Sequence, residues 1–165
     1  ICEGETEVCY LNLLNKWYKS PIKIVSHIEG TKITPSLVEN RIKELKISSR
    51  DKVYTFLMYD MDVEVVNEKL LKCKAEMLLS NPCFEIWLLL HIKDQKTAIK
   101  TDALIKELKK IAPVWKNYNK SAFTDTQQSF LKDNTDVAVI RAKDLCEFQN
   151  PSTGIYKLIE MLKKR

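Results

Sequence analysis

The chain has 165 residues and a formal charge of +5, with 45% hydrophobic and 30% charged residues. This length allows one domain with its own core, and the composition excludes an intrinsically disordered chain. The longest apolar run, Ile86 to Leu90, is far too short to span a membrane, and no signal peptide is visible. We therefore expect a cytoplasmic globular protein.

The first half of the chain alternates between predicted strands and helices. Ile1-Cys2 is expected to end a first strand that begins upstream of this sequence, because a strand usually needs about five residues. The strand predicted over 53–59 is apolar on both faces apart from Thr55, which is typical of a central parallel strand covered by helices on both sides. The other predicted elements are a helix over 6–18, a strand over 22–28, a helix from Thr34-Pro35 and a helix over 63–74.

The second half becomes helical. After a short strand over 76–79, Asn81-Pro82 begin a helix over 83–92 that is apolar nearly all round and should be buried. Further helices are expected over 103–111, 127–132, 136–147 and 153–164, with a loop over 113–126. This order predicts an α/β fold with a parallel, doubly wound sheet. Residues 1–92 would form the core, and residues 93–165 a helical part packed on it within the same domain.

Positive charge is concentrated in one stretch of the sequence. Residues 93–132 hold nine lysines and four acidic residues, which suits a polyanion held beside an acidic cluster. For the charge alone, a solvated helical face is the simpler explanation.

The cysteines indicate a reduced protein. There are five of them, an odd number without a CxxC pair, so a zinc site is not expected. They are Cys2, Cys9, Cys73, Cys83 and Cys146.

Two aspartates follow the most apolar predicted strand. Asp60 and Asp62 lie at its carboxyl end, where open α/β sheets bind ligands, and their i, i+2 spacing should point both toward one cleft. Two close carboxylates repel, and a divalent metal ion removes that repulsion. The alternative is that Asp62 caps the helix that begins at Val63 and that Asp60 is a loop acid. A lone DxD supports either interpretation.

Two glutamates strengthen the metal interpretation. Glu3 ends the first strand, and Glu7 lies in the first turn of the following helix. Since the ends of the first and third strands of a parallel sheet can be neighbours, we expect Glu3 to face Asp60. Favourable placement at a helix N-terminus is an alternative explanation for Glu7, and it is weaker for Glu3.

A third group of residues lies in the stretch from Ser80 to His91. Asn81 and Pro82 are explained by the start of a helix. Glu85 lies among apolar neighbours, where a carboxylate needs a partner such as Lys, Arg, a backbone amide or a metal ion. For His91, favourable interaction with the helix dipole is the leading explanation.

Basic and aromatic residues alternate in the predicted loop. Lys116, Tyr118, Lys120 and Phe123 suit phosphate contact and base stacking on a nucleic acid. Equally, Trp115 and Phe123 can be core residues that anchor the loop. The sequence lacks the Walker, GxSxG, HExxH and dinucleotide-binding motifs, and it holds only three glycines.

Taken together, three segments resemble the RloB-like family: Glu3-Gly4-Glu5-Thr6-Glu7, Asp60-Met61-Asp62 and Ser80 to His91. Asn150-Pro151-Ser152-Thr153 and the closing amphipathic helix fit as well, so the resemblance covers essentially the whole chain. RloB-like proteins are bacterial, occur near restriction-modification and phage-defence genes, and are similar to Toprim domains. The resemblance implies a Toprim-like, mainly parallel sheet flanked by helices, with a helical C-terminal extension.

The resemblance also implies roles for individual residues around Mg²⁺ or Mn²⁺. The implied metal ligands are Glu3, Asp60, Asp62, Ser80 and Glu85. The implied catalytic residues are Glu3, Glu7, which matches the second Glu of an EGxxE form, and Lys120 as the basic group. Val63 stands where a further acid would follow the DxD, which weakens the case for a second metal ion.

The implied function is a metal-dependent nuclease that hydrolyses DNA or RNA in bacterial anti-phage defence. A partner ATPase and a homo-oligomeric state are further expectations. The alternative from another class is a Toprim-like binding subunit of an ATPase-containing complex that has lost turnover. A strand-passing or primase fragment is disfavoured, because no catalytic Tyr context or polymerase-like extension is evident.

Overall fold

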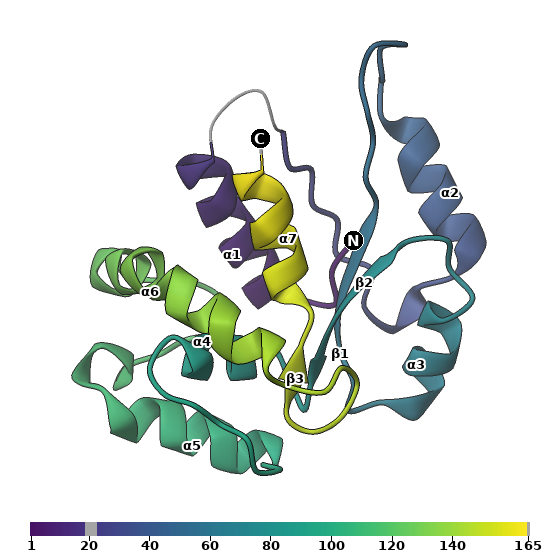
Figure 1. The fold of residues 1–165 in the computed structure, drawn as a ribbon. Helices are drawn as coiled ribbons and strands as arrows, with labels where there is room; N and C mark the ends of the chain where they lie inside the picture. Colours follow the sequence, from purple (N-terminus) through teal and green to yellow (C-terminus); the bar gives the residue numbers. More distant parts are fainter. Residues whose placement is uncertain (19–22, 165) are drawn as a thin grey trace.

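The computed structural model describes residues 1–18 and 23–164, which form a small sheet with helices on both faces (Figure 1). The helices are α1 (Glu5–Trp17), α2 (Pro35–Glu44), α3 (Glu64–Leu70), α4 (Glu85–Leu90), α5 (Thr101–Ile111), α6 (Asp125–Lys143) and α7 (Ile155–Lys163). The strands are β1 (Phe56–Asp60), β2 (Glu76–Asn81) and β3 (Ser152–Thr153), and short 3-10 turns cover Gly30–Lys32 and Pro113–Trp115.

The sheet is mixed, in the order β1-β2-β3. β1 and β2 run parallel, with a register that ends at Asp60 opposite Ser80. β3 pairs antiparallel with the end of β2, at Ser80 with Thr153 and Asn81 with Ser152. The α/β class is therefore confirmed, whereas the prediction of a mainly parallel sheet is wrong, because the sheet is mixed and β3 runs antiparallel to β2.

Cys2 extends the sheet beyond β1. It forms parallel bridges with Ile28 on one side and Met58 on the other. The N–H of Glu3 donates to the carbonyl of Met58 at 3.1 Å. This places Glu3 beside the end of β1, next to Asp60, as the sequence predicted.

Within the second predicted strand, 22–28, the described residues 23–28 do not form a continuous strand. Pro21 and Ile22 lie outside the described residues, and of residues 23–28 only Ile28 forms a bridge. A side chain takes the place of a neighbouring strand here: Asn15 of α1 accepts from the N–H of Ile24 at 2.9 Å and donates to its carbonyl at 2.8 Å. These bonds satisfy backbone groups that a strand ladder would otherwise use.

Other predicted elements shift at their ends. The helix start at Thr34-Pro35 is confirmed, since the Thr34 hydroxyl caps α2 by accepting from the N–H of Leu37. β1 begins only at Phe56, and Val53 and Tyr54 are exposed.

The two helices predicted over 127–132 and 136–147 are one 19-residue helix, α6, which begins with a capping box between Thr124 and Gln127. The helix continues through the polar segment at its centre because the polar side chains there form hydrogen bonds with carbonyls one turn earlier in the same helix. The amide of Asn134 donates to the carbonyl of Phe130, and the hydroxyl of Thr135 donates to that of Leu131. The split predicted from the sequence was therefore wrong.

Two hydrophobic clusters lie on opposite faces of the sheet. α1, α4, α6 and α7 bury the larger one, and α2 and α3 cover the smaller one (Figure 1). Helix α4 is buried throughout, as predicted, and contacts α5 and α6. The part of the chain after residue 92 packs on the core, although it is not wholly helical because it supplies β3. No helix among the described residues is long and apolar enough to cross a membrane.

Candidate functional site

Three elements meet through carboxylate-to-backbone hydrogen bonds at the carboxyl end of β1. Oε2 of Glu3 accepts from the N–H of Asp60 at 2.9 Å. Oδ1 of Asp60 in turn accepts from the N–H of Phe84 at 2.7 Å, just before α4. The amide of Phe84 is available because the first N–H groups of a helix have no partner within it.

Two further glutamates are buried near these acids. Glu7 lies in the first turn of α1, and Glu85 begins α4 with only 1% of its side chain exposed. Oε1 of Glu85 accepts from the hydroxyl of Tyr118 at 3.1 Å and lies 3.2 Å from Nζ of Lys120. The sequence predicted that Glu85 needs a cationic, amide or metal partner, and Lys120 is such a cation.

The four carboxylates influence one another electrostatically. Burial raises the pKa of Asp60 to about 8, and the charges of Glu7, Glu3 and Glu85 add to the effect. Burial likewise raises the pKa of Glu7, with contributions from Glu3 and Glu85. The pKa of Glu3 is raised by burial and by the charge of Asp62, while Lys120 opposes the rise. The residues Glu3, Glu7, Asp60 and Glu85, here called the carboxylate cluster, therefore share one crowded region.

Asp62 and Ser80 lie at its edge. Asp62 is exposed, and it does not cap α3, whose N-cap position is Val63. Ser80 is buried, and its hydroxyl forms a 2.9 Å hydrogen bond with that of Thr153. This bond joins β2 to β3, so Ser80 has a structural partner that the sequence did not indicate.

The residues predicted to contact nucleic acid, in the loop after η2 (Pro113–Trp115), differ in how exposed they are. Lys116 and Lys120 are exposed. Tyr118 is buried and packs against Trp115 and Phe123. The prediction that core aromatics anchor the loop is thus confirmed for Trp115 and Phe123. The ring of Tyr118 belongs to the same cluster, which leaves no open face for base stacking.

His91 lies away from the carboxylates, in the core. Its Nδ1–H donates to the carbonyl of Trp87 at 2.8 Å, and the ring is buried. Burial lowers its pKa to about 4, and Arg141 contributes to the shift. The side chain is therefore neutral at pH 7 and has a structural role.

Whether these residues suit a divalent metal ion depends on chemistry and on geometry. Among residues 1–18 and 23–164, no three His, Cys, Asp or Glu side chains are gathered so that they could hold a metal ion. The donors are nevertheless hard oxygens, which Mg²⁺ and Mn²⁺ prefer. Oε2 of Glu85 is buried without a hydrogen-bond partner in the described part of the chain. The donor set fits such an ion, provided that side chains move to bring their oxygens together.

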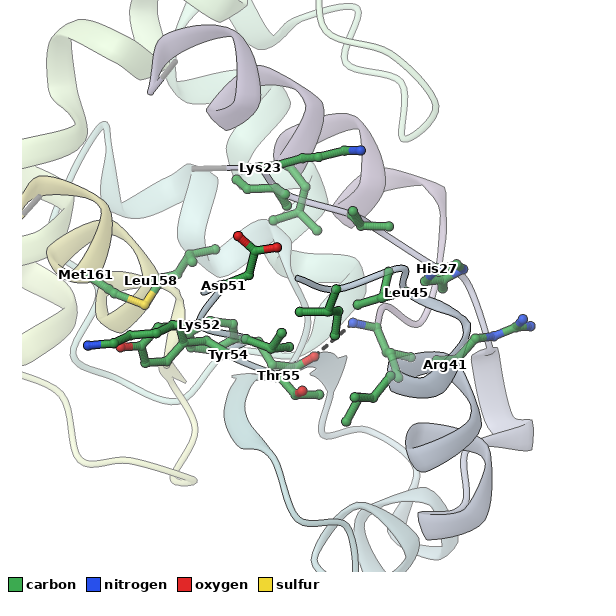
Figure 2. A pocket seen from close by; sticks show the side chains of 18 of the residues that line it. Lys23, His27, Arg41, Leu45, Asp51, Lys52, Tyr54, Thr55, Leu158 and Met161 are labelled. Atoms are coloured by element: carbon green, nitrogen blue, oxygen red, sulfur yellow. Dashed lines mark hydrogen bonds between the residues drawn. The ribbon is translucent and has the colours of Figure 1, made fainter. Parts of the chain in front are cut away.

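A large cavity lies elsewhere, near the amino end of β1. It has a volume of about 670 Å³ and is lined by segments 23–27, 41–47 and 50–56 together with α7. Figure 2 shows Lys23, Arg41 and Lys52 among the side chains around it. None of the cluster carboxylates lines this cavity.

The chain matches the family model described as RloB-like protein over residues 1–162. Since this match covers nearly its whole length, the protein belongs to the RloB-like family, which confirms the resemblance seen in the motifs. Searches of curated proteins and of solved structures found no match.

Proposed function

We propose that the carboxylate cluster binds Mg²⁺ or Mn²⁺ and that the protein is a metal-dependent nuclease acting on DNA or RNA. The observation that carries this proposal is the gathering of acids at the carboxyl end of β1, where Glu3 accepts from the N–H of Asp60 and Asp60 accepts from the N–H of Phe84 just before Glu85. Oε2 of Glu85 is buried there without a hydrogen-bond partner in the described part of the chain. Crowding of negative carboxylates costs free energy unless a cation neutralises them. Among the described residues, the cation that interacts with Glu85 and Asp60 is the exposed Lys120.

The protein's own residues would divide the work of phosphodiester hydrolysis. Glu3, Glu7, Asp60 and Glu85 would hold the ion, with Asp62 at the rim of the site. A bound divalent ion would polarise the phosphate and activate a water molecule. Lys120 would hold a phosphate oxygen at the mouth of the site, and Lys116 on the same loop would contact the backbone further along.

The finer fold assignment and the biological setting are also part of this proposal. The spatial order of parallel neighbours across the sheet, Ile28, Cys2, Met58 and β2, supports a Toprim-like arrangement with its acids at the strand ends. Family membership supports a cytoplasmic role in bacterial anti-phage defence beside a partner ATPase.

A second candidate is a binding subunit without turnover. It is favoured by the backbone hydrogen bonds that Glu3 and Asp60 accept, because these join the segment before α1 to β1 and to the start of α4 without any ion. If the protein is such a binding subunit, the carboxylates have a structural role in holding loops in place. The protein would then bind its partner ATPase without catalysing a reaction.

Cleavage assays separate the two candidates. Purified protein is incubated with plasmid DNA, single-stranded DNA or tRNA and with Mg²⁺ or Mn²⁺. The proposal predicts cleavage by the wild-type protein that chelator abolishes, and at least 100-fold slower cleavage by Asp60→Ala/Asp62→Ala, a loss of ~3 kcal/mol in transition-state stabilisation.

The matched control is Asp133→Ala/Asp144→Ala, which removes two exposed aspartates from α6 and its end. It should cleave at the wild-type rate. Equal cleavage by both double variants would refute the assignment of the site. Metal binding without cleavage of any substrate, with the partner ATPase present, would favour the binding subunit.

A further inference from the structure

Two side chains of one loop reach the same oxygen of Glu85. The hydroxyl of Tyr118 donates to Oε1 at 3.1 Å, and Nζ of Lys120 lies 3.2 Å from that atom. Oε2 has no hydrogen-bond partner among the described residues, although it is buried. The carboxylate is therefore held through Oε1, while Oε2 keeps its capacity to accept a ligand.

Tyr118 is a fixed partner. Its ring centroid lies 5.7 Å from that of Trp115 and 6.3 Å from that of Phe123, and only 5% of the residue is exposed. The packing of the ring therefore fixes the position from which the hydroxyl donates to Glu85.

Lys120 is a displaceable partner. Its side chain is 57% exposed, so water can take over its ammonium group when the ion pair breaks. The ammonium group of Lys120 is rehydrated at little cost when it leaves, whereas the buried carboxylate of Glu85 then needs another cation. The two partners of Glu85 therefore differ in how firmly they are held.

We propose that Tyr118 is a positioning residue that keeps Oε2 of Glu85 free for an incoming divalent cation, and that Lys120 is an interim counter-ion which this cation displaces. The proposal rests on the proposed metal site. It is supported by the placement of Glu85, which begins α4 one residue after Phe84, whose N–H donates to Oδ1 of Asp60. The released Lys120 is then available to a substrate phosphate.

The two roles predict opposite effects on metal affinity. Tyr118→Phe keeps the ring but removes a hydrogen bond to a charged group, which should weaken Mn²⁺ binding about tenfold. Lys120→Met removes the competing charge and should strengthen Mn²⁺ binding roughly two- to fivefold, because the lost ion pair is partly exposed.

The chain contains a matched control on its surface. Oε1 of Glu147 likewise accepts a hydrogen bond from a tyrosine, Tyr156, at 2.9 Å and forms an ion pair with a lysine, Lys157, whose Nζ lies 2.7 Å away. Tyr156→Phe and Lys157→Met make the same chemical changes at an exposed carboxylate away from the cluster. Both should bind Mn²⁺ as the wild type does.

The experiment measures free Mn²⁺ by electron paramagnetic resonance during titration of each variant, with thermal unfolding of the metal-free proteins alongside. Weakened binding by Tyr118→Phe together with strengthened binding by Lys120→Met would support the proposal. Unchanged binding by Tyr118→Phe, or weakened binding by Lys120→Met, would overturn it. Failure of the wild type to bind Mn²⁺ would overturn the proposed function and this inference together, and the wild-type titration alone reveals that case.

Discussion

At the residue scale, burial shifts the pKa values of His91 and Asp60 in opposite directions. His91 is buried against Trp87, and its pKa falls from 6.5 to about 4. Asp60 lies among other carboxylates, and its pKa rises from 3.8 to about 8. In both cases burial favours the neutral form of the side chain in the folded protein. Each group therefore makes the free energy of unfolding depend on pH, over the range between its unfolded and folded pKa values.

His91 should make the protein less stable in acid. Between pH 6.5 and about 4 the unfolded chain binds a proton at this side chain and the folded chain does not, so stability falls as the pH drops through that range. The loss is roughly 2–3 kcal/mol. His91→Asn should flatten the dependence, as measured by urea unfolding. An unchanged slope in His91→Asn would contradict this assignment.

Asp60 should have the opposite effect in metal-free protein. Between pH 3.8 and about 8 the unfolded chain has lost the proton that the folded chain keeps, so stability decreases as the pH rises. Asp60→Asn can still accept from the N–H of Phe84. Near pH 8 with chelator it should be more stable by about 2 kcal/mol, or roughly 5 °C in Tm. A lower Tm than wild type would show that the negative charge itself is stabilising.

At the element scale, the start of α7 is packed closely against β2. The N–H of Gly154 donates to the carbonyl of Leu79 at 2.8 Å. A Cβ at Gly154 would lie 3.1 Å from both the Cα of Leu78 and the carbonyl oxygen of Met77, and these backbone atoms cannot easily move. Gly154→Ala should therefore cost about 1–3 kcal/mol in urea unfolding.

Gly4→Ala is the matched control for that substitution. Its Cβ would meet only Oε2 of Glu7, at an ordinary contact distance of 3.5 Å. Because Gly is preferred to Ala at an N-cap position, a cost of no more than about 1 kcal/mol is expected here. Equal stability of the two variants would mean that α7 can move away from β2.

The sequence predicts an element well where its signal is local. The cap at Thr34-Pro35 and the apolar helix α4 follow from neighbouring residues, and both are confirmed. β3 has only two residues between Pro151 and Gly154, too few for any periodicity. The strand pairing expected near Ile24 is replaced by hydrogen bonds with the side chain of Asn15, nine residues earlier in α1. A side chain that takes the place of a strand in this way cannot be recognised from the pattern of hydrophobic residues.

The same distinction applies to the candidate site. The neighbourhood of Glu3 and Asp60 could be predicted, because strand ends in a parallel arrangement meet at one edge. The need of Glu85 for a partner followed from its apolar neighbours. That Tyr118 donates to it could not be predicted, because the two residues are 33 positions apart. The pairing of Ser80 with Thr153 depends in turn on β3, which the sequence did not reveal.

At the scale of the whole molecule, an acidic cluster lies beside a lysine-rich stretch, residues 93–132. If these lysines contact a phosphate backbone, nucleic-acid affinity should fall steeply with salt. Lys116→Met should reduce the slope of log K against log salt by about one. Lys46→Met, which lies by the cavity near the amino end of β1, should leave the slope unchanged. The same slope in all three proteins would exclude Lys116 from the contact.

If the carboxylate cluster is a divalent-metal site, crystals soaked in Mn²⁺ should show it by anomalous diffraction, because the signal locates the ion independently of any activity. We expect a peak within ligand distance of Asp60 and of at least one of Glu3, Glu7 and Glu85, at about 2.0–2.3 Å. Well-diffracting soaked crystals with no peak at these carboxylates, or with a peak only elsewhere on the protein, would contradict it.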